Sequence, residues 1–235
     1  MAACIVCLQE GRGASVCCPK PCPRKVHVAC LAKLLDNGFF QCPNCFVEYD
    51  AWAVLRAARY AIKQDPGRPQ RTVNLAQALR NTGAPAKALR LLSGIAPSCG
   101  YVRQMHTIEM AQSYLALGMA RAAKDLLMND LMTAPPSDRL PPGGLLVFLG
   151  KACVALGQIE HAEGALHRAL HYVSEFPPEL AVTTMETIAN LMTQKNEPEL
   201  YAKAHRCICQ IVDTEERLGP HTNSERGGTL RVFLL

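Results

Sequence analysis

Small and apolar residues repeat in one register along the middle of the chain. Three stretches superimpose without gaps: NLAQALRNTGAPAKALRLL, EMAQSYLALGMARAAKDLL and FLGKACVALGQIEHAEGAL. In each, a small residue is followed by an apolar residue after three positions, by glycine after four more and by alanine after five more. The three sets are Ala76, Leu79, Gly83 and Ala88; Ala111, Tyr114, Gly118 and Ala123; and Gly150, Cys153, Gly157 and Ala162. Small residues let antiparallel helices approach closely and glycine permits a left-handed turn, so each copy predicts a helical hairpin that stacks on its neighbours.

A fourth copy, TIANLMTQKNEPELYAKAHRCI, follows the pattern less closely. It has Ala189 at the small position and Met192 at the apolar one, puts Asn196 at the turn, and reaches its alanine, Ala204, after three additional residues. The four small residues are 35, 39 and 39 positions apart, and a longer connection at 134–144 interrupts the series.

The four units resemble tetratricopeptide repeats (TPRs), whose usual step is about 34 residues. The later segment ICQIVDTEERLGPHTNSE resembles the repeat ends of kinesin light chains. The resemblance spans residues 70–222 and leaves 223–235 as a tail; the alternative is an ordinary helical bundle with alanine-rich packing.

The TPR resemblance implies a curved stack whose groove is lined by the first helix of each pair and binds a protein or peptide of unknown identity. The polar residues that it assigns to the groove are Gln77, Arg80, Asn81, Gln112, Lys151, Asn190 and Gln194. Val73 and Ile108 are assigned to the same face. Ordinary solvated surface is the alternative interpretation of these polar residues.

A separate helix is predicted over residues 51–65, between the repeats and the amino-terminal part. Asp50 can cap the stretch AWAVLRAARYAIKQ, in which Trp52, Leu55 and Ile62 fall on one face, and DPGRP ends it.

Residues 1–50 contain eight of the chain's 12 cysteines but few large apolar side chains. So short a segment seldom folds around a hydrophobic core alone, whereas thiolates two residues apart can reach one zinc ion from a tight turn. The pairs CIVC, HVAC and CPNC have this spacing, and Cys22 with one of its neighbours Cys17 and Cys18 completes eight ligands. We therefore expect two tetrahedral zinc ions, each contributing about 10 kcal/mol to folding.

The order of these pairs resembles the cross-braced zinc modules of the RING-variant (RING-CH) and PHD-finger group, in which successive pairs alternate between metals. The resemblance implies one zinc ion held by Cys4, Cys7, His27 and Cys30 and another held by Cys18 (or Cys17), Cys22, Cys42 and Cys45. Cys18 is preferred because it leaves a shorter loop before Cys22, and Cys17 would then be a packed strand residue after Val16.

Two variants of the cross-brace remain open. The segment CPRKVHVAC resembles a PHD finger, a reader of histone tails, whereas CIVCLQE, VHVACLAKLL and CPNCFVEY resemble a RING variant with a short helix after Cys30. RING modules dock a ubiquitin-conjugating enzyme in an apolar groove, to which the matching positions Val6, Leu34 and Pro43 would contribute. Packing of the small fold is the alternative role of Val6 and Leu34, and Phe46 stands where many active RINGs have arginine.

Charge and composition point away from several other classes. A net charge of +5 from scattered basic residues favours neither nucleic acid nor a membrane as partner, and the most apolar run is short and broken by Lys151. The start MAACIVC lacks the pattern of a signal peptide, so we expect a cytosolic or nuclear protein with reduced thiols. The other cysteines, at 99, 153, 207 and 209, are expected to be small buried hydrophobes.

Together these features predict a mainly α fold: a small two-zinc cross-brace domain over residues 1–50, then an α-solenoid of helix-turn-helix repeats. The RING resemblance implies a ubiquitin ligase that has no nucleophile of its own and acts by positioning a conjugating enzyme beside a target. The alternative is a non-catalytic zinc-finger and TPR scaffold, with a PHD-like peptide reader as one form of it.

Overall fold

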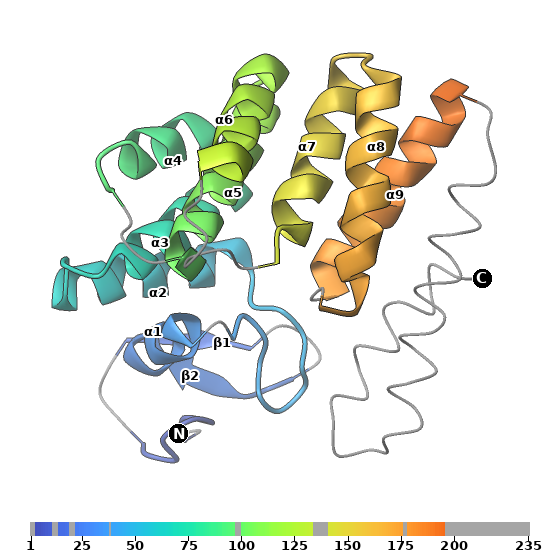
Figure 1. Cartoon of the computed structure of the whole chain (residues 1–235). Coiled ribbons are helices and arrows are strands. Elements are labelled where there is room, and N and C mark those ends of the chain that lie inside the picture. The colour runs from blue at the N-terminus through green and yellow to red at the C-terminus, as the bar shows by residue number, and fades with distance from the viewer. Residues whose placement is uncertain are drawn as a thin grey trace. The chain divides into compact units, whose positions relative to one another are not determined.

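The structure is a computed structural model that describes residues 3–10, 14–18, 22–37, 39–96, 100–133, 141–175 and 178–195. It is mainly helical, as predicted (Figure 1). The chain forms two compact units, Met1–Leu117 and Gly118–Leu235, each of which has its own packing. No helix in the described part is both long and apolar enough to cross a membrane.

The first unit begins with a cysteine-rich head. Strands β1 (Ser15–Cys17) and β2 (Lys25–His27) pair antiparallel, with Val16 opposite Val26, and α1 (Val28–Asp36) follows β2 directly. Figure 1 shows α1 lying beside this hairpin. The helix buries Leu31 and Leu35, which are at most 1% exposed, so a small apolar core does exist in the head beside the cysteines.

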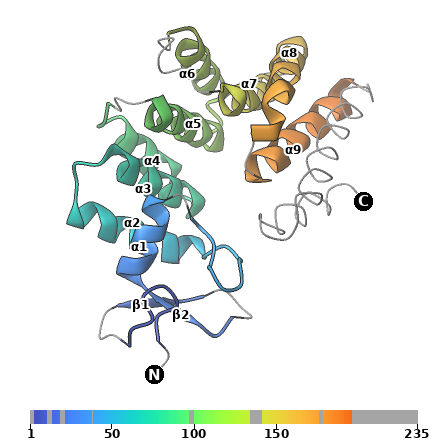
Figure 2. The same cartoon turned by 60° about the horizontal axis from the view of Figure 1, so that its bottom comes forward.

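Helix α2 (Ala51–Gln64) begins as predicted, because the Asp50 carboxylate accepts hydrogen bonds from the backbone N–H groups of Trp52 and Ala53 at 3.0 and 2.9 Å. Its buried face is made mainly of alanines, so α2 can lie close to both α1 and α3 (Figure 2). The prediction that Trp52 shares this face is wrong: the side chain is 70% exposed. Four small alanines fill the space between the helices and leave the large ring on the opposite side.

Helices α3 (Pro69–Asn81) and α4 (Pro85–Leu92) form the first repeat hairpin, and α5 (Gly100–Ala116) completes the unit. The head is joined to this hairpin by polar contacts as well as by apolar packing. The Arg71 guanidinium of α3 donates to both carboxylate oxygens of Asp36 at the end of α1, at 2.6 to 3.1 Å, and Asn74 Nδ2 donates to the Leu35 carbonyl at 3.0 Å.

The second unit contains α6 (Ala120–Thr133), α7 (Gly143–Ala155), α8 (Ile159–Ala169), the 3-10 helix η2 (Leu170–Glu175) and α9 (Pro178–Lys195). Helices α7 and α8 lie side by side and form the most closely packed hairpin of this unit (Figure 2). Cys153 on α7 is buried, as predicted.

The predicted repeat register is confirmed in the first three copies. Gly83, Gly118 and Gly157 have φ values of 79°, 74° and 68°, in the left-handed region that glycine adopts without strain. The second-helix alanines Ala88, Ala123 and Ala162 are fully buried.

The small residue Gly150 shows why the register demands small side chains. A Cβ atom built on Gly150 would lie 2.7 Å from Leu166 Cγ of α8, whereas one built on Gly164 of α8 meets nothing within 4 Å.

We expect Gly150→Ala to lower the free energy of unfolding by about 1–3 kcal/mol through overpacking. The matched control, Gly164→Ala, should raise it by about 0.5–1 kcal/mol because glycine weakens helix interiors. Chemical denaturation measures both, and equal effects of the two variants would contradict the close approach.

The fourth copy is displaced from the predicted register. Ala189 on α9 is exposed, whereas Thr184, Ile188 and Leu191 are buried. The sequence match of this copy consists of Ala189, Met192 and Asn196, with Ala204 three positions late. So few positions do not determine which face of a helix is buried. Asn196, Ala204, the kinesin-like segment and Cys99, Cys207 and Cys209 lie outside the described residues.

Two residues assigned to the repeat groove are also placed differently. Val73 is fully buried in a cluster with Ala76, Ala88 and Leu92, and Ile108 is 8% exposed. Because α3 packs against both α4 and α5, its apolar face has no free side at Val73.

Candidate metal centre

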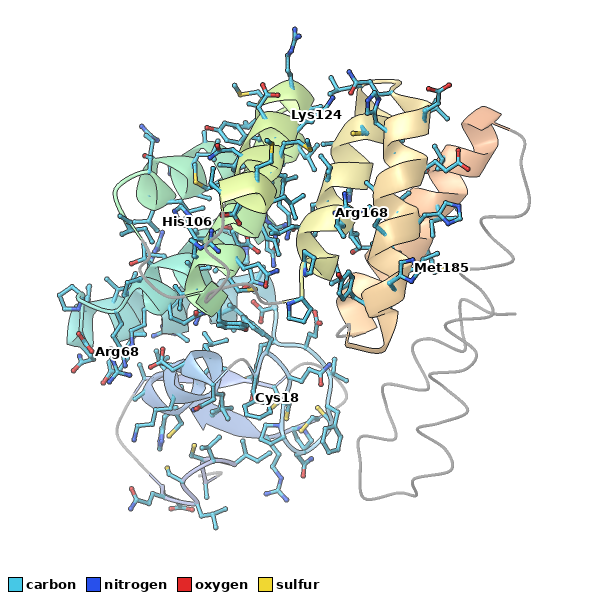
Figure 3. All side chains as sticks on the ribbon, viewed as in Figure 1. Cys18, Arg68, His106, Lys124, Arg168 and Met185 are labelled. Carbon is cyan, nitrogen blue, oxygen red and sulfur yellow. The ribbon has the colours of Figure 1, made fainter. Side chains whose placement is uncertain are left out.

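The head gathers its cysteines and one histidine into two clusters. The ligand atoms of Cys4, Cys7, His27 and Cys30 all lie within 4.8 Å of one another, and so do those of Cys18, Cys22 and Cys42. In Figure 3 the labelled Cys18 lies among several sulfur atoms of the head. Cys45 is not part of the tight second group, but burial and the neighbouring Cys42 and Cys22 thiols raise the pKa of its thiol. The pairs thus alternate between clusters along the chain.

Two turns with the same backbone geometry present the CIVC and CPNC thiols. In the first, Leu8 N–H donates to the Cys4 carbonyl at 2.8 Å; in the second, Phe46 N–H donates to the Cys42 carbonyl at 2.7 Å. Leu8 and Phe46 have φ values of 59° and 55° and are the described non-glycine residues in the left-handed region. Both turns therefore place a residue in a sparsely populated backbone conformation at the same position, so they present their thiols with the same local shape.

In the first cluster, His27 directs its Nδ1 atom toward the thiols. Nδ1 lies 3.4 Å from Cys7 Sγ and 4.0 Å from Cys30 Sγ, and the His27 backbone N–H donates to Cys4 Sγ at 3.4 Å. Burial acts to raise the pKa of Cys4, but hydrogen bonds from backbone N–H groups outweigh it and lower the pKa to about 6. Burial, reinforced by the neighbouring thiols, raises the pKa of Cys30 to about 12.

In the second cluster, Cys18 and Cys42 have their sulfur atoms 3.2 Å apart. Asn44 is a neighbour that the sequence did not single out: its backbone N–H donates to Cys42 Sγ and its side-chain amide to Cys22 Sγ, both at 3.5 Å. Burial acts to raise the pKa of Cys42, but the Asn44 backbone N–H and interactions with Cys18 and Cys45 lower it to about 7. Burial and the facing Cys42 thiol raise the pKa of Cys18 to about 12.

Tyr49 is a second neighbour that sequence reasoning missed. Its hydroxyl lies 3.8 Å from Cys18 Sγ, the residue is 5% exposed, and burial raises the pKa of its hydroxyl. In the sequence, an aromatic residue four positions after Cys45 and directly before the helix cap Asp50 was the signal that could have pointed to it.

The chemistry of both clusters fits zinc. The first offers three sulfurs and one imidazole nitrogen, and the second offers three sulfurs with a fourth beside them, which are the donor sets of structural zinc sites. Backbone and amide N–H groups already point at the sulfurs, as expected around coordinated thiolates. Metal binding would displace the protons that Cys18 and Cys30 hold at neutral pH.

The adjacent cysteines occupy different environments. Cys18 is 6% exposed within the second cluster, whereas Cys17 is exposed on β1, so it is not the packed strand residue that was expected.

We expect Cys18→Ser to lose one of two bound zinc ions and Cys17→Ser, the neighbouring control, to keep both. Native mass spectrometry counts the ions. Equal stoichiometry in the two variants would contradict the assignment of Cys18.

The residues that the RING resemblance assigns to enzyme docking lie on the surface of the head. Val6 is 37% exposed, Pro43 is exposed, and Leu34 on α1 is half-buried, in contrast to the buried Leu31 and Leu35 of the same helix. Phe46, the residue after the last predicted ligand, is 51% exposed.

The polar residues assigned to the repeat groove are divided between the two units. In the first unit, Gln77 and Gln112 are half-buried on α3 and α5, and Asn81 is exposed. Arg80 is bound to a buried partner: its guanidinium donates to Glu109 of α5 at 3.0 and 3.3 Å. In the second unit, Lys151 and Asn190 are exposed, and the side chain of Gln194 lies outside the described set.

Comparison with one of two similar solved structures supports the repeat fold. The crystal structure of TTC0263, a thermophilic TPR protein in Thermus thermophilus, aligns with 88% of this chain and 98% of its own, with a TM-score of 0.56 and 19% identity. A MamA RS-1 ArsTM double mutant aligns with 75% of this chain and 90% of its own, with a TM-score of 0.47 and 15% identity. The sequence matches no protein-family profile and no curated protein. The helical part is thus a TPR-like solenoid.

Proposed function

We propose that the protein is a non-catalytic scaffold, in which a two-zinc cross-braced head stabilises a TPR-like arm that binds a peptide segment of another protein. The observation that carries this proposal is the shared core of head and arm. Leu31 and Leu35 of the head belong to the same buried cluster as Ala57 and Ala58 of α2 and Ala78 of α3.

The polar contact at the end of α1 supports the same conclusion. The side chains of Asp36 and Arg71 are 18% and 15% exposed, so their ion pair is partly shielded from water and from salt. A head that is fixed to the first repeat both by packing and by this pair is suited to hold the arm rather than to move independently of it.

Peptide binding by the arm is tested with the zinc-loaded full chain. A displayed peptide library is selected on the protein, and the binders are measured against the double variant Gln77→Ala/Gln112→Ala, which changes equivalent positions on α3 and α5. We expect the double variant to lose affinity and Lys87→Ala, an exposed control on α4, to retain it. Failure to select any peptide, or equal affinity for all three proteins, would count against the scaffold.

A ubiquitin ligase is the second function that we propose, on a specific observation. Val6 and Pro43 are exposed on the head, and Leu34 is a half-buried residue at the edge of its apolar core. Such residues fit docking of a conjugating enzyme, and ligation would then follow from positioning alone.

An ubiquitination assay with an activating enzyme, a panel of conjugating enzymes and the zinc-loaded chain separates the two functions. Chains that form with the wild type and vanish with Val6→Ala or Leu34→Ala favour the ligase. Absence of chains across the panel, with zinc still bound and the head folded, favours the scaffold.

A further inference from the structure

The outer face of α2 combines aromatic and basic side chains. Trp52 and Tyr60 are 70% and 37% exposed, and Arg56, Arg59 and Lys63 are exposed as well. At 3.6 residues per turn these five side chains fall within about 100° of the helix circumference, opposite the alanine face that packs against α1 and α3. We call them the α2 outer face. It extends for about 17 Å along the helix, or three turns.

The charge of the α2 outer face is uncompensated. No aspartate or glutamate occurs between Ala51 and Gln64. The two acids at the helix ends are engaged elsewhere: Asp50 caps the helix, and Asp65 pairs with Arg68 at 2.9 Å and with Arg71 at 3.6 Å. Within the described ranges, no carboxylate pairs with the three cations of the face.

We propose that the α2 outer face is a docking surface for an acidic protein segment, separate from the repeat groove. Tryptophan, tyrosine and arginine are the residues that dominate binding energy at protein interfaces, and here they occur together on one face of a helix. Arginine forks bind carboxylates bidentately, and cations one turn apart match acids spaced three or four residues apart on a partner helix.

An acidic protein segment fits this face better than nucleic acid does. Three cations supply three phosphate contacts at most, whereas proteins that hold nucleic acid by its backbone commonly make about 6–10. The aromatic side chains instead offer apolar area for the non-polar residues of an amphipathic acidic peptide.

The test uses the zinc-loaded full chain and its intrinsic fluorescence, because Trp52 is the single tryptophan of the sequence. The probe is a synthetic 20-residue helical peptide of glutamate and leucine, and a second peptide has glutamine in place of glutamate. We expect the acidic peptide to shift the Trp52 emission to the blue and to protect the ring from acrylamide quenching. The glutamine peptide should do neither, and added salt should weaken the effect.

Charge reversal locates the binding. Arg56→Glu/Arg59→Glu should weaken binding of the acidic peptide at least about tenfold, because like charges then face each other. The matched control, Lys87→Glu/Arg90→Glu, reverses two exposed cations on α4 and should leave affinity unchanged, as should the groove variant Gln77→Ala/Gln112→Ala. Circular dichroism checks that each variant is folded, and Lys63→Glu serves as a second test of the face if the double variant is not.

Several results would overturn the proposal. The first is an unchanged Trp52 emission at millimolar acidic peptide. The second is an equal loss of peptide affinity in the α4 control variant. The third is that the chain binds oligo(dT) or phosphatidylserine vesicles but does not bind the peptide. Loss of binding in the groove variant alone would assign the peptide to the arm, which would leave the proposed scaffold intact and refute a second surface on α2.

Discussion

Removal of zinc by a strong chelator is expected to unfold the head and to loosen the first two helices that pack on it. Each structural zinc contributes about 10 kcal/mol or more to the folding of a small domain, which exceeds what the few buried side chains of the head supply. Without metal, buried thiols such as Cys4 and Cys42, at 2% and 0% exposed, would each face the other cysteines of their own cluster with nothing to coordinate.

The effect should extend beyond the head because its core is shared. Leu31 and Leu35 of α1 cover the alanine face of α2, and Asp36 holds Arg71 of α3. Loss of α1 would expose that face and break the ion pair. We therefore expect backbone amides of α2 and α3 to lose protection in hydrogen exchange when the metal is removed.

The second compact unit supplies an internal control for this experiment. Helices α7 and α8 pack on each other within Gly118–Leu235, so their amide protection should change little. Addition of excess zinc should restore protection in α2 and α3. A head that keeps its shape in chelator, or protection that falls equally in α7 and α8, would refute metal-dependent folding of the first unit.

The features that the sequence predicted well are those with a strict local requirement. A helix turn that needs positive φ accepts glycine, and close helix approach accepts only small residues, so the positions of Gly83, Gly157 and Ala162 could be recognised without a structure. Ligand spacing is similarly strict, and the structure brings seven of the eight predicted ligands, all except Cys45, together in two groups.

Features that depend on contacts between distant residues could not be predicted. Trp52 was expected inside because large apolar residues dominate a hydrophobic pattern, whereas alanines carry little weight in it although they form the buried face of α2. The approach of Tyr49 to Cys18 joins residues 31 positions apart, and no periodicity indicates such a contact. The same limit applies to Arg80, which was assigned to the groove without regard to a partner on another helix.

Replacement of Arg80 by methionine is expected to lower the free energy of unfolding by about 3–5 kcal/mol at neutral pH. Glu109 of α5 is 2% exposed, and the Arg80 guanidinium, 20% exposed, is bound to both of its carboxylate oxygens. Removal of the arginine would leave a buried carboxylate without its compensating charge. Chemical denaturation of the wild type and the variant measures the difference.

The matched double variant, Arg80→Met/Glu109→Met, distinguishes loss of the pair from loss of packing. A buried ion pair replaced by apolar side chains of similar volume often costs little, so the double variant should recover most of the stability. Arg90→Met, which alters an exposed arginine on α4, should stay within about 0.5 kcal/mol of the wild type. A double variant as unstable as the single one would show that the arginine acts through its packing.

The pH dependence of the Arg80→Met defect follows from Glu109. Burial raises the pKa of this carboxyl and Arg80 lowers it, with burial the larger effect, so the variant should raise the pKa further. A folded-state pKa above the unfolded one means that the folded protein holds more protons, and stability then falls as pH rises through that interval. The defect should therefore be smaller at pH 5 than at pH 7.5. Protonation of the clustered thiols of the head affects both proteins alike, so it cancels in the difference between wild type and variant. A defect that grows on acidification would contradict a buried, ionised Glu109.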